Sequence, residues 1–129
     1  MEIRPYEAKD FDHIQCLNKE EGWNNLVEND RNTKEGWEKS NIAYVVVSED
    51  HGMIGYVRGL TDGHISLYIC ELLIDKRFRG IGLGKEILKY IHSEYPQTRM
   101  EMLASSSSHT YYESQGFRSF YGYRKAYGE

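Results

Sequence analysis

Residues 65–103 constrain the fold of this chain more than any other part of the sequence. They begin with the strand-like stretch ISLYICELLI, whose end is apolar on both faces, as in a strand beside a crossover helix. The glycine-rich stretch RFRGIGLG then leads into an amphipathic helix that Pro96 ends. TRMEML reads as the next strand. Two strands joined through a helix run parallel, so the sheet contains a parallel pair.

Shorter strands and helices are predicted before this unit. MEIRPY reads as a strand that ends at Pro5, and apolar residues at helical spacing predict a helix over residues 8–19. Residues 20–40 are polar and read as an irregular helical segment. NIAYVVVSED and MIGYVRGL read as two further strands, each followed by turn residues, at 50–52 and 61–64.

The last part of the chain predicts a short helix over residues 108–114, with Gly116 as its left-handed cap. A final strand would run from Phe117 to about Tyr123, and the aromatic stretch FRSFYGYRKAY makes it a candidate homodimer edge. The predicted order is β-α-α-β-β-β-α-β-α-β. The fold class is therefore α/β (α+β), with a mixed, mainly antiparallel central sheet flanked by helices in a single domain over residues 1–129.

The net charge, the cysteine content and the apolar runs of the sequence exclude several classes of partner and indicate a compartment. The formal net charge is −4, without the basic surplus that phosphate backbones require, so we expect no nucleic-acid partner. Cys16 and Cys70 belong to no paired motif, which indicates two mostly buried free thiols in a reducing compartment and no metal site. The longest apolar run, residues 43–47, is too short to span a membrane, and no signal peptide is visible. We expect a cytoplasmic protein.

The glycine-rich stretch predicts a phosphate site. Glycines let backbone N–H groups close around an anion, and a helix begins here with unpaired N–H groups and a partial positive charge. The cationic side chains of Arg77, Arg79 and Lys85 strengthen the attraction. The nucleotide-binding patterns G-x-x-x-x-G-K-[S/T] and G-x-G-x-x-G both fail here, because the residues at their fixed positions are wrong.

What does match is R-x-x-G-x-G over Arg79–Gly84, which resembles the signature of the GNAT superfamily of acyl-CoA-dependent N-acyltransferases. A second block, YYESQGF at residues 111–117, is similar to the F-Y-E-K-x-G-F segment of the same family. The predicted element order also resembles the GNAT order over nearly the whole chain.

The resemblance implies a GNAT-like fold, acetyl-CoA as co-substrate without a metal, and transfer of an acetyl group to a primary amine. Pyrophosphate would bind at the glycine turn, and the strand residues before the turn would pair with pantetheine through their backbone. A backbone N–H near Leu73 would polarise the thioester carbonyl. The coenzyme-binding residues implied in this way are Leu73, Ile74, Arg79, Gly80, Ile81, Gly82, Leu83, Gly84 and Lys85.

Two residues are candidates for proton transfer. Tyr112 matches the tyrosine of the family block and would protonate the leaving thiolate, since a phenol is a suitable proton source for it; the alternative is a packing role against the coenzyme. Glu71 is the candidate base that takes a proton from the amine. Ordered water, or a substrate-binding or structural role for Glu71, is the alternative. Tyr111 reads as a packing residue.

The acceptor is expected to be a small-molecule amine. In GNAT proteins the first two helices and their connecting loop form a wall of the acceptor site, and carboxylates with an aromatic residue suit an amine. A solvated polar face is the alternative for this segment. His64 and His109 read as surface residues or as residues whose hydrogen bonds are satisfied. Ser105–Ser108 read as helix-capping serines, and contact with the coenzyme is the alternative. The residues expected in the wall of the acceptor site are Glu20, Glu21, Trp23, Asn24, Asn25 and Glu28.

The alternative function for the whole protein is a coenzyme-binding module without turnover.

Overall fold

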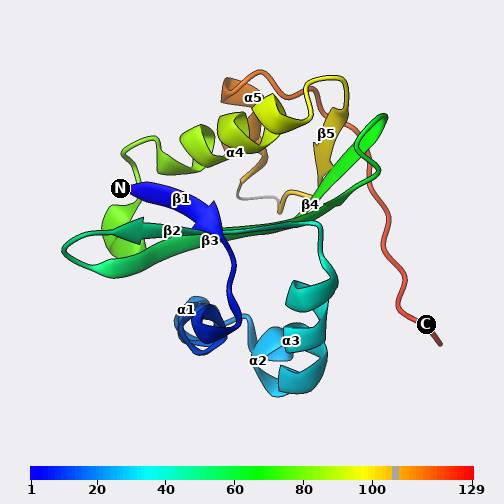
Figure 1. The fold of residues 1–129 in the computed structure, drawn as a ribbon. Helices are drawn as coiled ribbons and strands as arrows, with labels where there is room; N and C mark the ends of the chain where they lie inside the picture. The colour runs from blue at the N-terminus through cyan, green and yellow to red at the C-terminus, as the bar shows by residue number, and fades with distance from the viewer. Residues whose placement is uncertain (106–107) are drawn as a thin grey trace.

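The computed structural model describes residues 1–105 and 108–129. Five strands form one sheet in the order β1-β2-β3-β4-β5. Helices α1, α2 and α3 cover one face of the sheet, and α4 and α5 lie on the other (Figure 1). The layered arrangement and the mixed sheet confirm the fold class predicted from the sequence.

Five of the six strands predicted from the sequence form in the described part of the chain. They are β1 (Glu2–Pro5), β2 (Ile42–Ser48), β3 (Gly52–Thr61), β4 (Ser66–Ile74) and β5 (Arg99–Met102). The first four pair antiparallel in order along the chain, and β4 pairs with β5 in parallel. The predicted crossover is therefore confirmed.

Helix α4 (Leu83–Glu94) makes that crossover, and α5 (His109–Ser114) follows β5. On the other face, a 3-10 turn, η1 (Ala8–Asp10), leads into α1 (Phe11–Glu21). The polar segment predicted as irregular contains two regular helices, α2 (Asn24–Glu28) and α3 (Asp30–Lys39). None of these helices has the length and hydropathy that a bilayer-spanning segment requires.

The sheet separates two hydrophobic cores. Val46 and Val57 pack with Ile87 and Ile91 of α4 on one side. On the other, residues of α1 and α3 pack against the strands around Tyr56. Because neighbouring strand residues point to opposite faces, the β-branched run of β2 supplies both cores.

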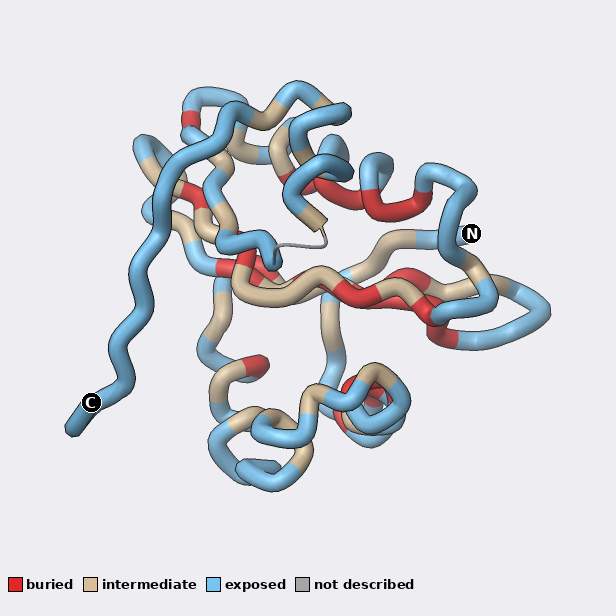
Figure 2. The backbone as a smooth tube through the Cα atoms, turned by 180° about the vertical axis from the view of Figure 1, so that it is seen from behind, coloured by how far each residue is buried: buried red, intermediate tan, exposed pale blue. Residues whose placement is uncertain are grey.

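The strand predicted over Phe117–Tyr123 does not form. In the described part of the chain, residues 117–126 have no regular secondary structure, and the terminal segment runs along the outside of the domain (Figure 2). Phe120, Tyr121 and Tyr123 are 80%, 97% and 94% exposed. A strand needs a partner edge and one apolar face, but Phe120 and Tyr121 are consecutive, and within residues 1–105 and 108–129 no strand pairs with this segment.

The cysteines are both free, as predicted, but only one is sheltered. Cys16 is exposed on α1, and Cys70 is half-buried in β4. The expectation that both are mostly buried is wrong for Cys16, because it lies on the solvent side of an amphipathic helix whose other face holds Ile14 and Leu17.

Candidate functional site

The glycine turn has the backbone geometry of an anion site. After η2 (Lys76–Phe78), Gly80 and Gly82 adopt φ values of +81° and +85°, which side chains with a Cβ rarely adopt. Gly82 is the N-cap residue of α4, and its carbonyl accepts the N–H of Glu86 at 3.1 Å. The first N–H groups of α4 therefore have no partners within the helix and point toward the turn.

Strand β4 is open next to this turn. Its register with β5 covers only Ser66–Ile69, so β4 has no β5 partner beyond Ile69 in the described part of the chain. On the β3 side the register shifts after Arg58, leaving Cys70 as the extra residue of a bulge. The two parallel strands thus separate at the point where β4 approaches the glycine turn.

A cavity of about 930 Å³ occupies the opening between the strands. That volume lies within the range of small-molecule sites. The structure brings most predicted site residues together there, but Ile81 and Lys85 are exposed and do not line it. The predicted catalytic and coenzyme-binding residues that do line it are Glu71, Leu73, Ile74, Arg79, Gly80, Gly82, Leu83, Gly84 and Tyr112.

Tyr112 is fixed by the cap of α5. Gly116 adopts φ +92°, and the N–H of Phe117 returns to the carbonyl of Tyr112 at 3.2 Å. The ring of Tyr112 packs between Tyr111 and Phe117, with centroid distances of 5.1 and 5.7 Å. Burial, and to a smaller extent Tyr111, raises the pKa of Tyr112, so its phenol stays protonated at neutral pH.

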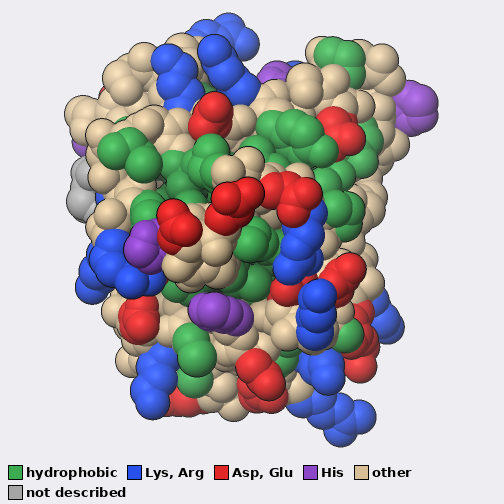
Figure 3. Space-filling view, turned by 60° about the vertical axis from the view of Figure 1, so that its left-hand side comes forward, with side chains coloured by type: hydrophobic (Ala, Val, Ile, Leu, Met, Phe, Trp, Pro, Cys, Tyr) green, Lys and Arg blue, Asp and Glu red, His purple; other side chains and the backbone are tan. Residues whose placement is uncertain are grey.

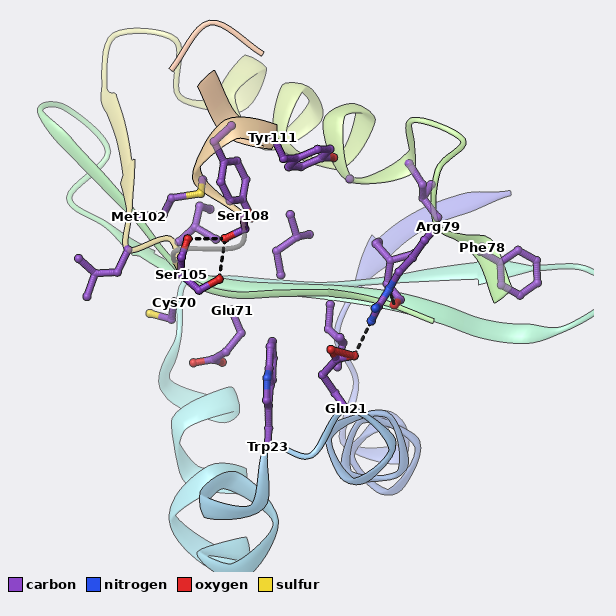
Figure 4. Close-up of a pocket in the computed structure, with 18 of the residues that line it drawn as sticks. Glu21, Trp23, Cys70, Glu71, Phe78, Arg79, Met102, Ser105, Ser108 and Tyr111 are labelled. Carbon is purple, nitrogen blue, oxygen red and sulfur yellow. Dashed lines mark hydrogen bonds and ion pairs between the residues drawn. The ribbon is translucent and has the colours of Figure 1, made fainter. Parts of the chain in front are cut away.

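Tyr111, predicted only to pack, also lines the cavity (Figure 4). Its hydroxyl lies so close to Gly84 that a Cβ on that glycine would come within 2.8 Å of the hydroxyl oxygen. Sequence reasoning missed this contact because helical spacing alone did not indicate which of two adjacent tyrosines faces the turn. It also missed Cys70, Met102 and Leu103, which complete the cavity where the strands separate.

Glu71 lines the cavity but is paired with Arg58. Arg58 Nε donates to Oε1 at 2.6 Å, and Nη2 donates to Oε2 at 2.8 Å. Arg58 also donates through Nη1 to Ser40 Oγ at 3.0 Å, and the bond to Glu71 raises the pKa of Arg58. Both carboxylate oxygens of Glu71 are thus held by a fork of donors on the neighbouring strand.

Arg79 leaves the turn toward the other face of the sheet. Its Nε donates to the carbonyl of Ile74 at 2.9 Å, and its Nη2 donates to Glu21 at the end of α1 (Figure 4). Arg77 instead pairs with Asp75, at 3.2 Å from Nε and 3.0 Å from Nη2. The two arginines of the turn are therefore both paired with carboxylates of this chain.

The predicted acceptor wall is only partly at the cavity. Glu21 and Trp23 line it, whereas Glu20, Asn24, Asn25 and Glu28 are exposed and do not. Trp23 stands next to Glu71 on the α1–α3 side of the sheet (Figure 4). The left-handed Gly22, at φ +81°, and the bond from Trp23 N to Asn18 O at 2.9 Å turn the chain so that Trp23 faces inward.

The serines and histidines have different placements. Ser105 and Ser108 line the cavity, with 3.0 Å between their Oγ atoms, and residues 106 and 107 lie outside the described residues. Ser108 is the N-cap residue of α5, but its side chain makes no capping bond, so the expected capping role is wrong for it. His64 and His109 are exposed, as predicted, and neither side chain lines the cavity.

Acidic and basic side chains are interspersed on the face drawn in Figure 3, with hydrophobic side chains between them. Across residues 1–105 and 108–129, no three His, Cys, Asp or Glu side chains come together as a metal site would need.

The sequence matches a known family over nearly its whole length. Residues 6–126 match the acetyltransferase (GNAT) domain, so this chain belongs to the GNAT acetyltransferase family. The match covers the open strand, the glycine turn and the α5 block. A comparison with curated protein sequences gave no match.

Solved structures share the fold at low sequence identity. A GNAT family acetyltransferase from Streptococcus pneumoniae TIGR4 superposes with a TM-score of 0.79 at 15% identity, covering 99% of this chain and 97% of that one. Glucosamine-6-phosphate N-acetyltransferase from Arabidopsis thaliana gives 0.66 at 17% identity, covering 99% and 98%.

A putative acetyltransferase from Deinococcus radiodurans R1 gives a TM-score of 0.63 at 19% identity. The alignment covers 70% of this chain and 64% of the Deinococcus chain, so this chain spans less than two thirds of that protein's length. At such identities the three similarities establish the fold. The acceptor substrate must be inferred from the residues that line the cavity.

Proposed function

We propose that this protein transfers an acetyl group from acetyl-CoA to a primary amine of a small molecule. The observation that carries the proposal is one cavity that joins the glycine turn, the open edge of β4 and Tyr112. Membership of the GNAT acetyltransferase family supports acyl transfer as the reaction class.

The cavity residues fit the coenzyme by charge and by backbone hydrogen bonding. The first N–H groups of α4 and the guanidinium of Arg79 would bind the pyrophosphate. The backbone of Leu73 and Ile74, on the edge of β4 that β5 leaves open, would pair with the pantetheine amides. The bound coenzyme supplies the thioester that carries the acetyl group.

Tyr112 is the proposed proton donor to the leaving thiolate. It lines the cavity, and burial raises its pKa, so the phenol carries its proton at neutral pH and can donate it to a thiolate that forms beside it. The backbone N–H near Leu73 is the proposed donor to the thioester carbonyl, where negative charge develops.

Glu71 is the proposed acceptor of the amine proton, directly or through a water molecule. It lies next to the β4 bulge and opposite Trp23, where an amine could approach the open strand (Figure 4). Because Arg58 holds both oxygens, the carboxylate is oriented and does not turn away from the cavity. A water bridge would let it receive a proton without breaking that pair.

The size of the cavity supports a small acceptor, since the coenzyme arm would share the same volume of about 930 Å³. The free thiols of Cys16 and Cys70 support a reducing compartment, and we therefore place the reaction in the cytoplasm.

The first experiment is calorimetric titration with acetyl-CoA, followed by thiol-release assays with a panel of small primary amines. We expect saturable binding and amine-dependent release of coenzyme A. Arg79→Ala should weaken binding about tenfold, by removal of a charge-assisted contact. No binding to the unaltered protein would refute the proposal, and binding without turnover on any amine would indicate the coenzyme-binding module instead.

A further inference from the structure

The ion pair between Arg79 and Glu21 joins the two ends of the cavity. Arg79 belongs to the turn proposed for pyrophosphate, and Glu21 is the last residue of α1 on the acceptor side (Figure 4). Their side chains are 42% and 24% exposed, and both residues line the cavity. The guanidinium of Arg79, at the end proposed for the pyrophosphate, thus neutralises the carboxylate of Glu21, at the end proposed for the acceptor.

Coenzyme binding would compete for this cation. Arg77 already donates through two nitrogens to Asp75, and Lys85 is exposed outside the cavity, so Arg79 is the cation of the turn that reaches into it. A guanidinium binds a diphosphate more strongly than a single part-exposed carboxylate, because the diphosphate offers more charge and paired oxygens. Arg79 would then turn toward the first turn of α4.

Glu21 would be left as a carboxylate without a counter-charge. The neighbouring carboxylate in the cavity, Glu71, would keep both bonds to Arg58, which lies outside the phosphate end. Glu21 is held beside Trp23 by the left-handed turn at Gly22. An anionic oxygen next to an indole face is a favourable environment for an ammonium group.

We infer that Glu21 binds the ammonium group of the acceptor and that coenzyme binding releases it from Arg79 for this purpose. The inference rests on the proposed function and names the substrate class of the acceptor end: a cationic amine. Since coupling between two ligands is reciprocal, the amine also strengthens coenzyme binding by the same factor.

The first test compares coenzyme A binding to the unaltered protein and to Glu21→Gln by calorimetry. Coenzyme A carries no acetyl group, so no reaction disturbs the titration. We expect Glu21→Gln to bind about fivefold more tightly, at the lower end of typical couplings, because Arg79 no longer has a competing partner. The control is Glu35→Gln, an equal charge change on an exposed residue of α3, and its affinity should stay unchanged.

The second test follows n-butylammonium binding by NMR through the indole N–H signal of Trp23. The buried Trp37 is an internal reference. With coenzyme A bound, the unaltered protein should saturate at about fivefold lower n-butylammonium than without it. In Glu21→Gln the coenzyme should make no difference to n-butylammonium binding.

The outcomes separate the inference from the proposed function. If the unaltered protein binds no coenzyme A, the proposed function and the inference both fail. If it binds coenzyme A and Glu21→Gln binds with equal affinity, the inference fails and the proposed function stands. If Glu21→Gln does not fold, Glu21→Asp replaces it in both tests. The shorter aspartate side chain should not reach Arg79, so coenzyme A should bind more tightly. Because the carboxylate remains, the variant should still bind n-butylammonium.

Discussion

Tyr112 and Tyr111 are adjacent phenols that line one cavity, and their surroundings differ. Tyr112 is packed against Phe117 and has a raised pKa, whereas the Tyr111 hydroxyl touches the first turn of α4 at Gly84. A phenol ordinarily keeps its proton near neutral pH, so the proposed acid role rests on Tyr112 being the tyrosine of the family block, and it is open to a direct comparison with Tyr111.

Tyr112→Phe should therefore lower kcat about 10²–10⁴-fold, the usual contribution of a positioned acid, and leave coenzyme affinity unchanged. Steady-state kinetics and calorimetry with acetyl-CoA would measure the two effects. Tyr111→Phe is the matched control, because it removes a phenol from the same cavity and should keep most of kcat. The opposite pattern would transfer the acid role to Tyr111.

Asp10 is the buried carboxylate on which the entry to α1 depends. Burial acts to raise its pKa, but hydrogen bonds from Arg4, at 2.8 and 2.9 Å, and from Glu7 N, at 2.8 Å, outweigh burial and lower it. The bond from Glu7 N is the half of the η1 capping box that this carboxylate accepts.

Asp10→Asn should destabilise the fold by about 2 kcal/mol at pH 7, the typical value for hydrogen bonds to a charged group. Because the folded pKa lies below the ordinary value of about 3.9, the stabilisation is present above that pH and is lost as pH falls through the lowered pKa. Urea unfolding at pH 7 and pH 3 would measure it. An equal difference between the two proteins at both pH values would contradict this assignment.

Among the structural elements, the glycine turn and the parted strands position the site. The turn directs the N-terminus of α4 at the cavity, and the separation of β4 from β5 exposes strand backbone to it. Neither the direction of the α4 N-terminus nor the exposed β4 backbone depends on a reactive side chain. A variant that tests their contribution must therefore alter the backbone geometry.

Gly82→Ala should weaken acetyl-CoA binding about tenfold or more, because a Cβ at φ +85° costs roughly 1–2 kcal/mol and shifts the helix start. Calorimetry measures the affinity and thermal unfolding measures the stability. Gly63→Ala is the control: Gly63 has φ +81° and open space around it, and it lies in the β3–β4 turn away from the cavity. It should lose similar stability and no affinity. Equal affinity losses in both variants would argue against a phosphate role for the turn.

At the scale of the whole molecule, the aromatic side chains of the C-terminal segment stay largely exposed, although the guanidinium of Arg118 lies over the Phe120 ring at 5.7 Å from its centroid. Phe120, Tyr121 and Tyr123 each present a large apolar surface to solvent. The homodimer expected from the sequence would bury them against a second copy of the chain.

Light scattering should accordingly give a mass about twice the 15.1 kDa of one chain. Removal of residues 118–129 should reduce that mass to the monomer value and leave Tyr112 and the cavity in place. A monomeric mass for the intact chain would remove the homodimer prediction.

Local sequence determined most of the elements. Apolar periodicity gave the helices around Ile14 and Ile87, β-branched residues gave β2, and glycine spacing located the turn and the family block. These predictions succeeded because each depends on residues near one another in the chain. The crossover rule then determined the parallel pair without further information.

Tertiary structure decided what depends on distant partners. The pairing of Glu71 with Arg58 and of Arg79 with Glu21 joins residues 13 and 58 positions apart, which no local pattern encodes. The separation of β4 from β5, and the failure of residues 117–123 to form a strand, likewise depend on which edges meet in space. Local sequence determines backbone propensity and the glycine pattern of the turn, whereas contacts between remote segments decide which charges are paired and which surfaces stay open.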